Sequence, residues 1–354
     1  MSNVETAPEE ELCGAEPASD QTFELMQGRE VQLTPRSGTV VTRTLPNRER
    51  RMVGAWCFLD QYGPTYVGQG AGEGAGVGMS IAAHPHTGLQ TVSWLVAGEI
   101  HHYDSLGNSQ LIRPGQLNLM TAGRGIAHAE LSPEPHSDIL HGAQLWVALP
   151  SEHAGVAPHF EHHADLPVMD SPGATVTLLM GSIDGATSAA KTYSPLLGAE
   201  IALDADSAVK LPLRKDFEHA ILVLSGAVEI GLITLRQGPL LYLGRGREEI
   251  RLMAHGPSRA LLLGGEPFDE EIVMWWNFVG RDHEEIVQFR QEWESIAGQL
   301  DAEQLGAEQL GAGQLGAEQL GAERFGAVGG GYSGGTLPAP PLPTTRLKPR
   351  GRTR

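Results

Sequence analysis

Short apolar runs, separated by glycine and proline, dominate the chain from about residue 29 to residue 297. The runs are VGAWCFL, GLQTVSWLVAGEI, QLNLMTAG, HGAQLWVALP, TVTLLMG, AILVLSGAVEIG, PLLYLG and RALLLGG. Many strands of this length at this spacing are typical of β-sandwiches and barrels, whereas βαβ units would place helical periodicity between the strands. The pattern therefore predicts an all-β fold.

Two of these runs share one plan, which suggests a duplication. SWLVAGEIHH (93–102) and AILVLSGAVEIG (220–231) each contain an apolar strand, a turn made of a small residue and glycine, and a second strand. We interpret them as equivalent hairpins in two barrels, with a junction within 150–175, where prolines cluster. The predicted barrels span residues 29–160 and 161–297.

One helix is predicted near the end of the second barrel. Apolar positions recur at three- and four-residue spacing from Ile286 to Trp293, and Asp282 can cap the first turn. Residues 302–326 are then five copies of a pentapeptide: AEQLG, AEQLG, AGQLG, AEQLG and AERFG. A period of five advances a helix by about 140° net per repeat, so the leucines form no stripe. Each glycine also costs about 1 kcal/mol, which favours fluctuating helix or disorder there.

Both ends of the chain have low-complexity composition. Residues 1–28 carry many acidic side chains and few large apolar ones, so we expect a disordered lead-in. Residues 298–354 are predicted to form a disordered tail, in which GGGYSGG and PAPPLP make a flexible linker before a basic end. That basic end would touch an acidic partner, touch the chain's own acidic N-terminal tail, or remain solvated.

The overall charge limits the class of partner. The chain has 25 Lys and Arg against 43 Asp and Glu, for a formal charge of −18, so direct nucleic-acid binding is not expected. The first 20 residues lack the basic and apolar regions of a secretory signal, and no run approaches the roughly 18 apolar residues of a membrane span. Two cysteines, Cys13 and Cys57, make a disulfide framework unlikely in such a chain. We therefore expect a cytoplasmic monomer.

Two short motifs carry candidate chemistry. HPHTGLQT begins with His84 and His86, which lie two apart and so face the same side of a strand. MTAGRGIAHAE ends with His128 and Glu130 in the same spacing. If both pairs meet inside a barrel, they supply three imidazoles and one carboxylate. That donor set suits Fe(II), Mn(II), Ni(II), Cu(II) or Zn(II), and the residues alone do not choose among them.

Three further polar residues follow the first hairpin turn. His101, His102 and Tyr103 would either line the mouth of such a site or face solvent from their strand. In the second half, the equivalent hairpin offers His219 but no pair of histidines two apart. We therefore expect the second barrel to bind no metal.

The two motifs together resemble the pirin family of the cupin superfamily. The resemblance is carried by HPHTGLQTVSWLVAGEIHHYDSLGN, by QLNLMTAGRGIAHAE and by HGAQLWVALP, and GGEPFDEEIVMWWNFVGRDHEEI is similar to a bacterial branch with WWNFV. It covers roughly residues 30–297. It implies a bicupin with one Fe(II) in the N-terminal barrel only, held by His84, His86, His128 and Glu130. One departure is Gln90, where many pirins have glutamate.

The same resemblance implies two alternative functions. The first is a quercetin 2,3-dioxygenase type of enzyme, which opens a flavonol-like substrate with O₂ at a three-histidine, one-glutamate iron site. There Glu130 would also act as the catalytic base that accepts the substrate proton. The second is a non-enzymatic regulatory protein, whose redox- or metal-dependent surface binds a transcription factor or a metabolic enzyme.

Overall fold

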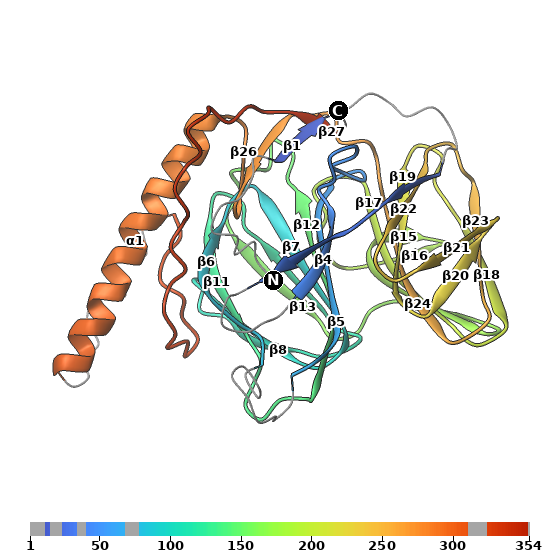
Figure 1. The fold of residues 1–354 in the computed structure, drawn as a ribbon, viewed down its shortest axis with the longest axis horizontal. Helices are drawn as coiled ribbons and strands as arrows, with labels where there is room; N and C mark the ends of the chain where they lie inside the picture. The colour runs from blue at the N-terminus through green and yellow to red at the C-terminus, as the bar shows by residue number, and fades with distance from the viewer. Residues whose placement is uncertain (1–10, 15–22, 34–39, 68–77, 311–323, 353–354) are drawn as a thin grey trace.

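Two β-barrels lie side by side in the structure, a computed structural model that describes residues 11–14, 23–33, 40–67, 78–310 and 324–352. In Figure 1 the first barrel runs from blue to green and the second is yellow. Each barrel consists of a large sheet and a four-stranded sheet. Within the described residues, no helix is both long and apolar enough to cross a membrane.

The first barrel is built from eleven strands that surround the candidate motifs. Its seven-stranded sheet has the order β13 (His159–His163), β10 (Leu117–Thr121), β7 (Leu89–Ala97), β12 (Ile139–Ala148), β5 (Trp56–Tyr66), β4 (Val40–Leu45), β3 (Arg29–Gln32). Its four-stranded sheet has the order β6 (Ser80–His86), β11 (Ile126–Leu131), β8 (Ile100–Asp104), β9 (Ser109–Ile112). β6, which carries His84 and His86, is therefore an edge strand of this sheet.

The second barrel repeats this plan, with one additional short strand. Its large sheet has the order β14 (Val168–Ser171), β15 (Ala174–Ile183), β17 (Leu196–Leu203), β24 (Ser258–Gly265), β19 (Glu218–Ser225), β22 (Leu240–Gly244), β2 (Glu24–Met26), and β16 (Ala186–Thr187) pairs with β15. Its small sheet has the order β18 (Ser207–Pro212), β23 (Glu249–Ala254), β20 (Ala227–Ile230), β21 (Ile233–Arg236). The all-β bicupin prediction is confirmed, and the two hairpins singled out in the sequence, β7–β8 and β19–β20, occupy equivalent places.

The barrels share one apolar core. Trp56, in the first barrel, is fully buried, and its indole Nε1 donates to the carbonyls of Leu197 (3.1 Å) and Gly264 (3.2 Å) in the second. Phe58 and Trp146 stack at 4.0 Å between ring centroids within the same core. The two barrels are therefore held together by buried side chains rather than by a linker alone.

Part of the N-terminal segment is strand, which corrects the expectation of disorder for residues 1–28. β2 pairs with β22 and so completes the second barrel from a position before the first. β1 (Glu11–Gly14) joins a fifth sheet, of order β26 (Phe278–Gly280), β25 (Ile272–Trp275), β1, β27 (Gly351–Arg352). Backbone pairing with distant strands orders these short segments, and composition does not reveal such pairing. The rest of the predicted lead-in, 1–10 and 15–22, lies outside the described residues.

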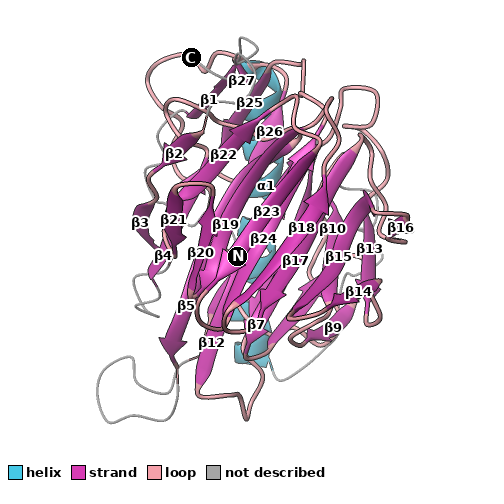
Figure 2. Ribbon diagram, turned by 90° about the vertical axis from the view of Figure 1, so that its right-hand side faces the viewer, coloured by secondary structure: helices cyan, strands magenta, loops and turns pink. Residues whose placement is uncertain are grey.

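Helix α1 (His283–Leu310) begins where the sequence predicts. Asp282 Oδ1 accepts the backbone N–H of Glu285 at 2.9 Å, so Asp282 caps the helix. Ile286 and Trp293 are buried against the end of the β-structure. The helix continues into the first repeats, further than the predicted boundary at 297, and residues 311–323 lie outside the described part. Figure 2, which faces the second barrel, shows α1 behind the strands.

Residues 324–352, here named the C-terminal strap, return along α1 and the first barrel (Figure 1). Composition predicted a flexible linker for this segment, and the structure differs because its backbone carbonyls find donors. Trp293 Nε1 donates to Leu337 O at 2.9 Å, and Arg290 Nε donates to Pro340 O at 2.6 Å. Phe325 and Leu347 of the strap are buried in the same cluster as Trp293.

The basic end of the strap contacts acidic residues of the same chain. Arg346 pairs with Glu284 of α1. Arg352 lies 3.0 Å from Asp269 and 3.4 Å from Glu218. Among the described residues, the acids that the strap contacts here belong to α1 and to the second half of the chain, and not to the acidic N-terminal tail that the sequence suggested.

Candidate metal centre

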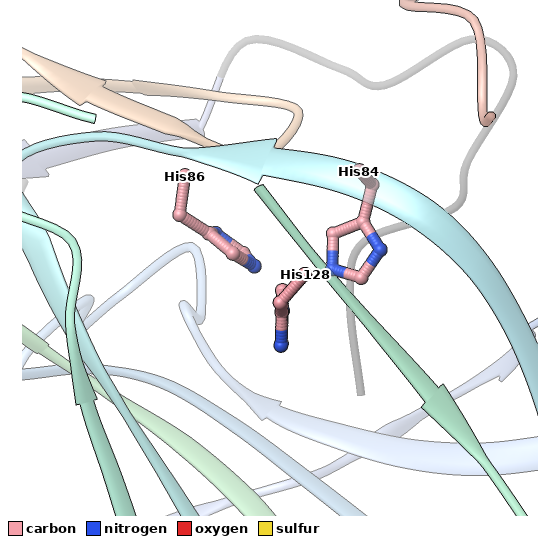
Figure 3. Close-up of side chains that lie close together, drawn as sticks. All are labelled: His84, His86 and His128. Atoms are coloured by element: carbon pink, nitrogen blue, oxygen red, sulfur yellow. The ribbon is translucent and has the colours of Figure 1, made fainter. Parts of the chain in front are cut away.

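Three histidine side chains converge between β6 and β11. These strands pair antiparallel, with His128 opposite His84 and Ile126 opposite His86. The ring centroids lie 4.3 Å apart for His84 and His128, 5.0 Å for His86 and His128, and 5.1 Å for His84 and His86. One nitrogen of each ring lies within 4.8 Å of the others, and all three residues are buried (Figure 3). The structure thus brings together three of the four predicted ligands.

A bulge in β6 helps to orient His84. Between the pairs His128–His84 and Glu130–Ile81 the register shifts, so β6 has one residue more than β11 over this stretch. The carbonyl of Ala82, within the bulge, accepts a hydrogen bond from His84 Nδ1 at 2.7 Å. With Nδ1 donating, the ring nitrogen left for a ligand is Nε2.

His86 is oriented by a residue far along the chain. Its Nδ1 donates to the carbonyl of Asn277, 3.1 Å away and 191 residues later in sequence. His86 Nε2 and His128 Nε2 are both buried without a hydrogen-bond partner among the described residues. Buried polar atoms are rarely left unpaired, so two such nitrogens in one cluster fit a bound metal ion.

The electrostatics keep these imidazoles neutral. Burial lowers the pKa of His84 from 6.5 to about 4. Burial, and then the neighbouring His84, lower the pKa of His86 and of His128 well below the ordinary value. Metal ions bind neutral imidazole, so the cluster is in its ligand form at neutral pH.

Glu130, the fourth predicted ligand, forms a second group around His128. Glu130, His102 and His128 each place a potential ligand atom within 4.8 Å of the others, and Glu130 is 1% exposed. Glu130 lies opposite His102 in the pairing of β11 with β8. His128 therefore belongs to both groups, and the carboxylate lies on the His102 side of the cluster.

His102 lies inside the barrel and is held on three sides. Its ring stacks on Phe160 at 4.4 Å, its Nε2 lies 3.2 Å from Asp104 Oδ2, and its Nδ1 lies 3.3 Å from His128 Nδ1. His101, the preceding residue, instead contacts Ser109 and is partly exposed. Of the two alternatives for this strand, His102 contacts a candidate ligand, and the two-residue period of a strand could have separated it from His101.

Gln90 does not join either group. Its Nε2 donates to Thr121 Oγ1 at 2.9 Å and to the carbonyl of Lys191 at 3.1 Å, a residue between β16 and β17. Glu218, at the start of β19 in the second barrel, contacts the first barrel in the same way: its Oε2 accepts the backbone N–H of Gly54 at 2.8 Å. Position 90 therefore helps to hold the two halves of the chain together.

In the second barrel the equivalent ligand positions carry other residues. β18 pairs with β23 as β6 pairs with β11, and Leu211 lies opposite Ile250 where the first barrel has His84 opposite His128. Leu213 follows in the place of His86, and leucine and isoleucine offer no ligand atom. Sequence reasoning missed Asn277 and Asp104, because neither belongs to a recognisable ligand motif.

Two tandem β-barrels, of which the first contains both groups of potential metal ligands found among the described residues, define a bicupin with one candidate metal centre. The family model described as Pirin matches residues 38–147, and the one described as Pirin C-terminal cupin domain matches residues 198–298. The chain belongs to the pirin family.

Relatives with assigned names agree with this membership. A Pseudomonas aeruginosa protein named "Putative quercetin 2,3-dioxygenase" is 48% identical over 270 residues, which is 75% of this chain and 83% of that protein. A pirin-like protein of Caulobacter vibrioides is 36% identical over 72% of this chain and 88% of its own length. The crystal structure of a quercetin 2,3-dioxygenase from Acinetobacter baumannii has a TM-score of 0.78 and 36% identity, covering 92% of this chain and 98% of that one.

Proposed function

We propose that this chain is a metal-dependent dioxygenase of the quercetin 2,3-dioxygenase type, acting on a flavonol-like substrate with O₂. The observation that carries the proposal is the pair of buried nitrogens, His86 Nε2 and His128 Nε2, which have no hydrogen-bond partner among the described residues. The names of the Pseudomonas and Acinetobacter relatives support the reaction type.

His84, His86, His128 and Glu130 are the residues that would hold the metal, Fe(II) or another divalent ion among Mn, Ni, Cu and Zn. A bound ion would supply Lewis acidity toward the substrate hydroxyl and a place where substrate and O₂ meet. The three imidazoles are neutral and Glu130 carries one negative charge, so a bound divalent ion would keep a net positive charge. That charge would favour binding of the substrate as its enolate. Burial of all four side chains limits competing water.

Glu130 has a second role in this proposal. Its carboxylate is the one anionic group among the four, and it accepts the proton of the substrate hydroxyl. His102 and Asp104 position the side chain of His128. His102 contacts His128 and is itself held by Asp104 and by stacking on the ring of Phe160. They hold His128 in place rather than contact the reacting atoms.

The test combines metal content with turnover. The full chain is purified after expression with Fe(II), its metal is counted by mass spectrometry, and loss of flavonol absorbance and release of carbon monoxide are followed under air. We expect about one ion per chain, loss of most of the metal in His84→Ala, and a loss of turnover of roughly 100-fold or more in Glu130→Gln, which keeps an oxygen donor but removes the base. His255→Ala is the control, since that imidazole is 67% exposed on the second barrel.

The same experiment distinguishes the dioxygenase from the alternative function, a non-enzymatic regulatory protein. Stoichiometric metal without turnover above that of the variants would contradict the enzyme and favour a regulatory protein. The link from His86 to Asn277 favours that alternative, because it connects the candidate centre to the segment that packs on α1 and the strap. A chain that binds no stoichiometric metal would contradict both functions.

A further inference from the structure

A cavity of about 190 Å³ lies in the second barrel, away from the candidate metal centre. Its wall includes Pro212, Leu213 and Arg214, which lie at the end of β18 and in the segment that joins it to β19. The cavity therefore lies between this segment and the end of β15, which contributes Ser182 and Ile183 to the wall.

One polar side chain in the wall of this cavity is unsatisfied. His219 is fully buried, and neither Nδ1 nor Nε2 has a hydrogen-bond partner among the described residues. The ring lies against Gly264, where a Cβ would come within 2.8 Å of His219 Cδ2. Burial lowers the pKa of this imidazole to about 4, so at neutral pH it offers one N–H donor and one bare acceptor nitrogen.

The remaining wall is mostly apolar. Ile183, Leu197, Leu213 and Phe217 line the cavity beside His219. Its volume is below the range of roughly 300–1,000 Å³ that is usual for drug-sized ligands, so it suits a compound with a single ring. A hydroxyl group is the matching polar feature, because it can donate to the bare nitrogen or accept from the N–H.

The charges at the mouth disfavour an anion. Arg214 is the one cationic side chain of the wall, and its Nε donates to Asp216 at 3.0 Å while its Nη2 lies 3.2 Å from Glu266. Asp184 adds a further carboxylate to the wall. A negatively charged ligand would therefore meet three carboxylates around one guanidinium that is already paired.

We infer that this cavity is a binding site for a neutral, single-ring compound with one hydroxyl group, of the phenol class, whose hydroxyl bonds to His219. The apolar residues contact the ring and exclude charged analogues. The site lies in the other barrel from the candidate metal centre and does not depend on the proposed dioxygenase reaction.

Phenol and toluene, which differ in the hydroxyl group, test the inference on the full chain by calorimetry and saturation-transfer NMR. We expect phenol to bind one-to-one in the millimolar range and toluene at least about tenfold more weakly, because a site built around a hydrogen bond rejects the analogue without it. His219→Leu should lose phenol binding and raise Tm by about 2–4 °C, because it removes an unpaired buried polar group. The control His255→Leu should bind phenol as the wild type does.

Equal affinity for phenol and toluene, no saturable phenol binding, or phenol binding retained in His219→Leu would each overturn the inference. If the variant fails to fold, the imidazole signals of His219 in the wild type decide: a shift on addition of phenol supports the site, and unchanged signals overturn it.

Discussion

His86 Nδ1 donates to the main-chain carbonyl of Asn277 at 3.1 Å, so a residue after the second barrel orients a side chain in the first. A second backbone hydrogen bond and burial accompany this link. Val279 N donates to Thr87 O at 3.1 Å, and Asn277 is fully buried between Trp276 and Phe278. The WWNFV segment, residues 275–279, therefore supports a candidate ligand.

Gly88 packs directly against this support, at Val279 of β26. It has φ +67°, and a Cβ there would come within 2.3 Å of Val279 O. We expect Gly88→Ala to push β26 away from the β6–β7 turn, loosen the hydrogen bond from His86 to Asn277, and lower both Tm and metal affinity. Metal titration with a competing chelator and thermal unfolding measure the two effects, and the loss of affinity should be about tenfold or more, as for other residues that orient a ligand.

Gly115→Ala is the matched control. Gly115 also has a positive φ, +81°, but nothing lies within 4 Å of its Cβ position. This variant should show the backbone strain alone, a cost of about 1 kcal/mol, with unchanged metal affinity. If Gly88→Ala behaves like Gly115→Ala, the contact with β26 does not support the site.

The buried imidazole of His219 should make stability depend on pH. Its pKa is about 4 in the folded chain and near 6.5 when unfolded, so between these values the unfolded state binds more protons. This contribution is fully present above pH 6.5, and it is lost as the pH falls toward 4, at up to roughly 1.4 kcal/mol per pH unit. Urea unfolding of the wild type and His219→Leu at pH 7.5, 6 and 5 measures it. The stability difference between them should widen in favour of the variant as the pH falls, and a constant difference would contradict the assigned pKa shift.

The strands and two of the ligand pairings could be predicted because their signals are local. A β-strand alternates its side chains, so His84 with His86 and His128 with Glu130 each had to share a face. The bulge in β6 was not predictable, because Ala82 and Ala83 have no sequence feature that distinguishes them from a regular strand. Because of the bulge, Glu130 pairs with Ile81. Its carboxylate lies in one group with His102 and His128.

The contacts that support the site could not be predicted for a different reason. Asn277 acts through its main-chain carbonyl, which every residue has, at a separation of 191 residues. The C-terminal strap likewise has no apolar period, and its order comes from donors such as Trp293 Nε1 on another element. Composition describes what such a segment does alone, whereas its structure depends on the surface it meets.

The strap should stabilise the free edge of β6. Ala83 N donates to Gly335 O at 3.1 Å, and Leu337 N donates to Ala83 O at 2.7 Å, so the strap adds backbone pairing beside His84. We expect Arg290→Ala, which removes the donor to Pro340 O, to lower Tm and speed cleavage of the strap in limited proteolysis. Arg346→Ala is the comparison, since its ion pair with Glu284 is 61% exposed and should leave both readouts unchanged. Equal protease sensitivity of the two variants would show that the donor to Pro340 does not hold the strap.

Arg43 and Asp60 form a buried ion pair across β4 and β5. Arg43 Nε lies 2.8 Å from Asp60 Oδ1 and Nη2 lies 2.9 Å from Oδ2, with 1% and 0% of the two side chains exposed. Removing one partner leaves the other charge buried, so we expect Arg43→Met to cost about 3–5 kcal/mol of unfolding free energy.

The double variant Arg43→Met with Asp60→Leu tests the origin of this loss in unfolding free energy. The loss comes either from the missing ion pair or from the one charge that stays buried without a partner. Both charges are then absent, and we expect most of the lost stability to return, because a matched apolar pair avoids the desolvation cost. Arg43 also lies over the ring of Phe58 at 4.4 Å, and the methionine side chain retains apolar contact with that ring. Urea unfolding of the wild type, both single variants and the double variant completes the cycle. A double variant no more stable than Arg43→Met would show that the loss of stability comes from packing around Arg43. It would not then come from the buried Asp60 carboxylate that has lost its partner.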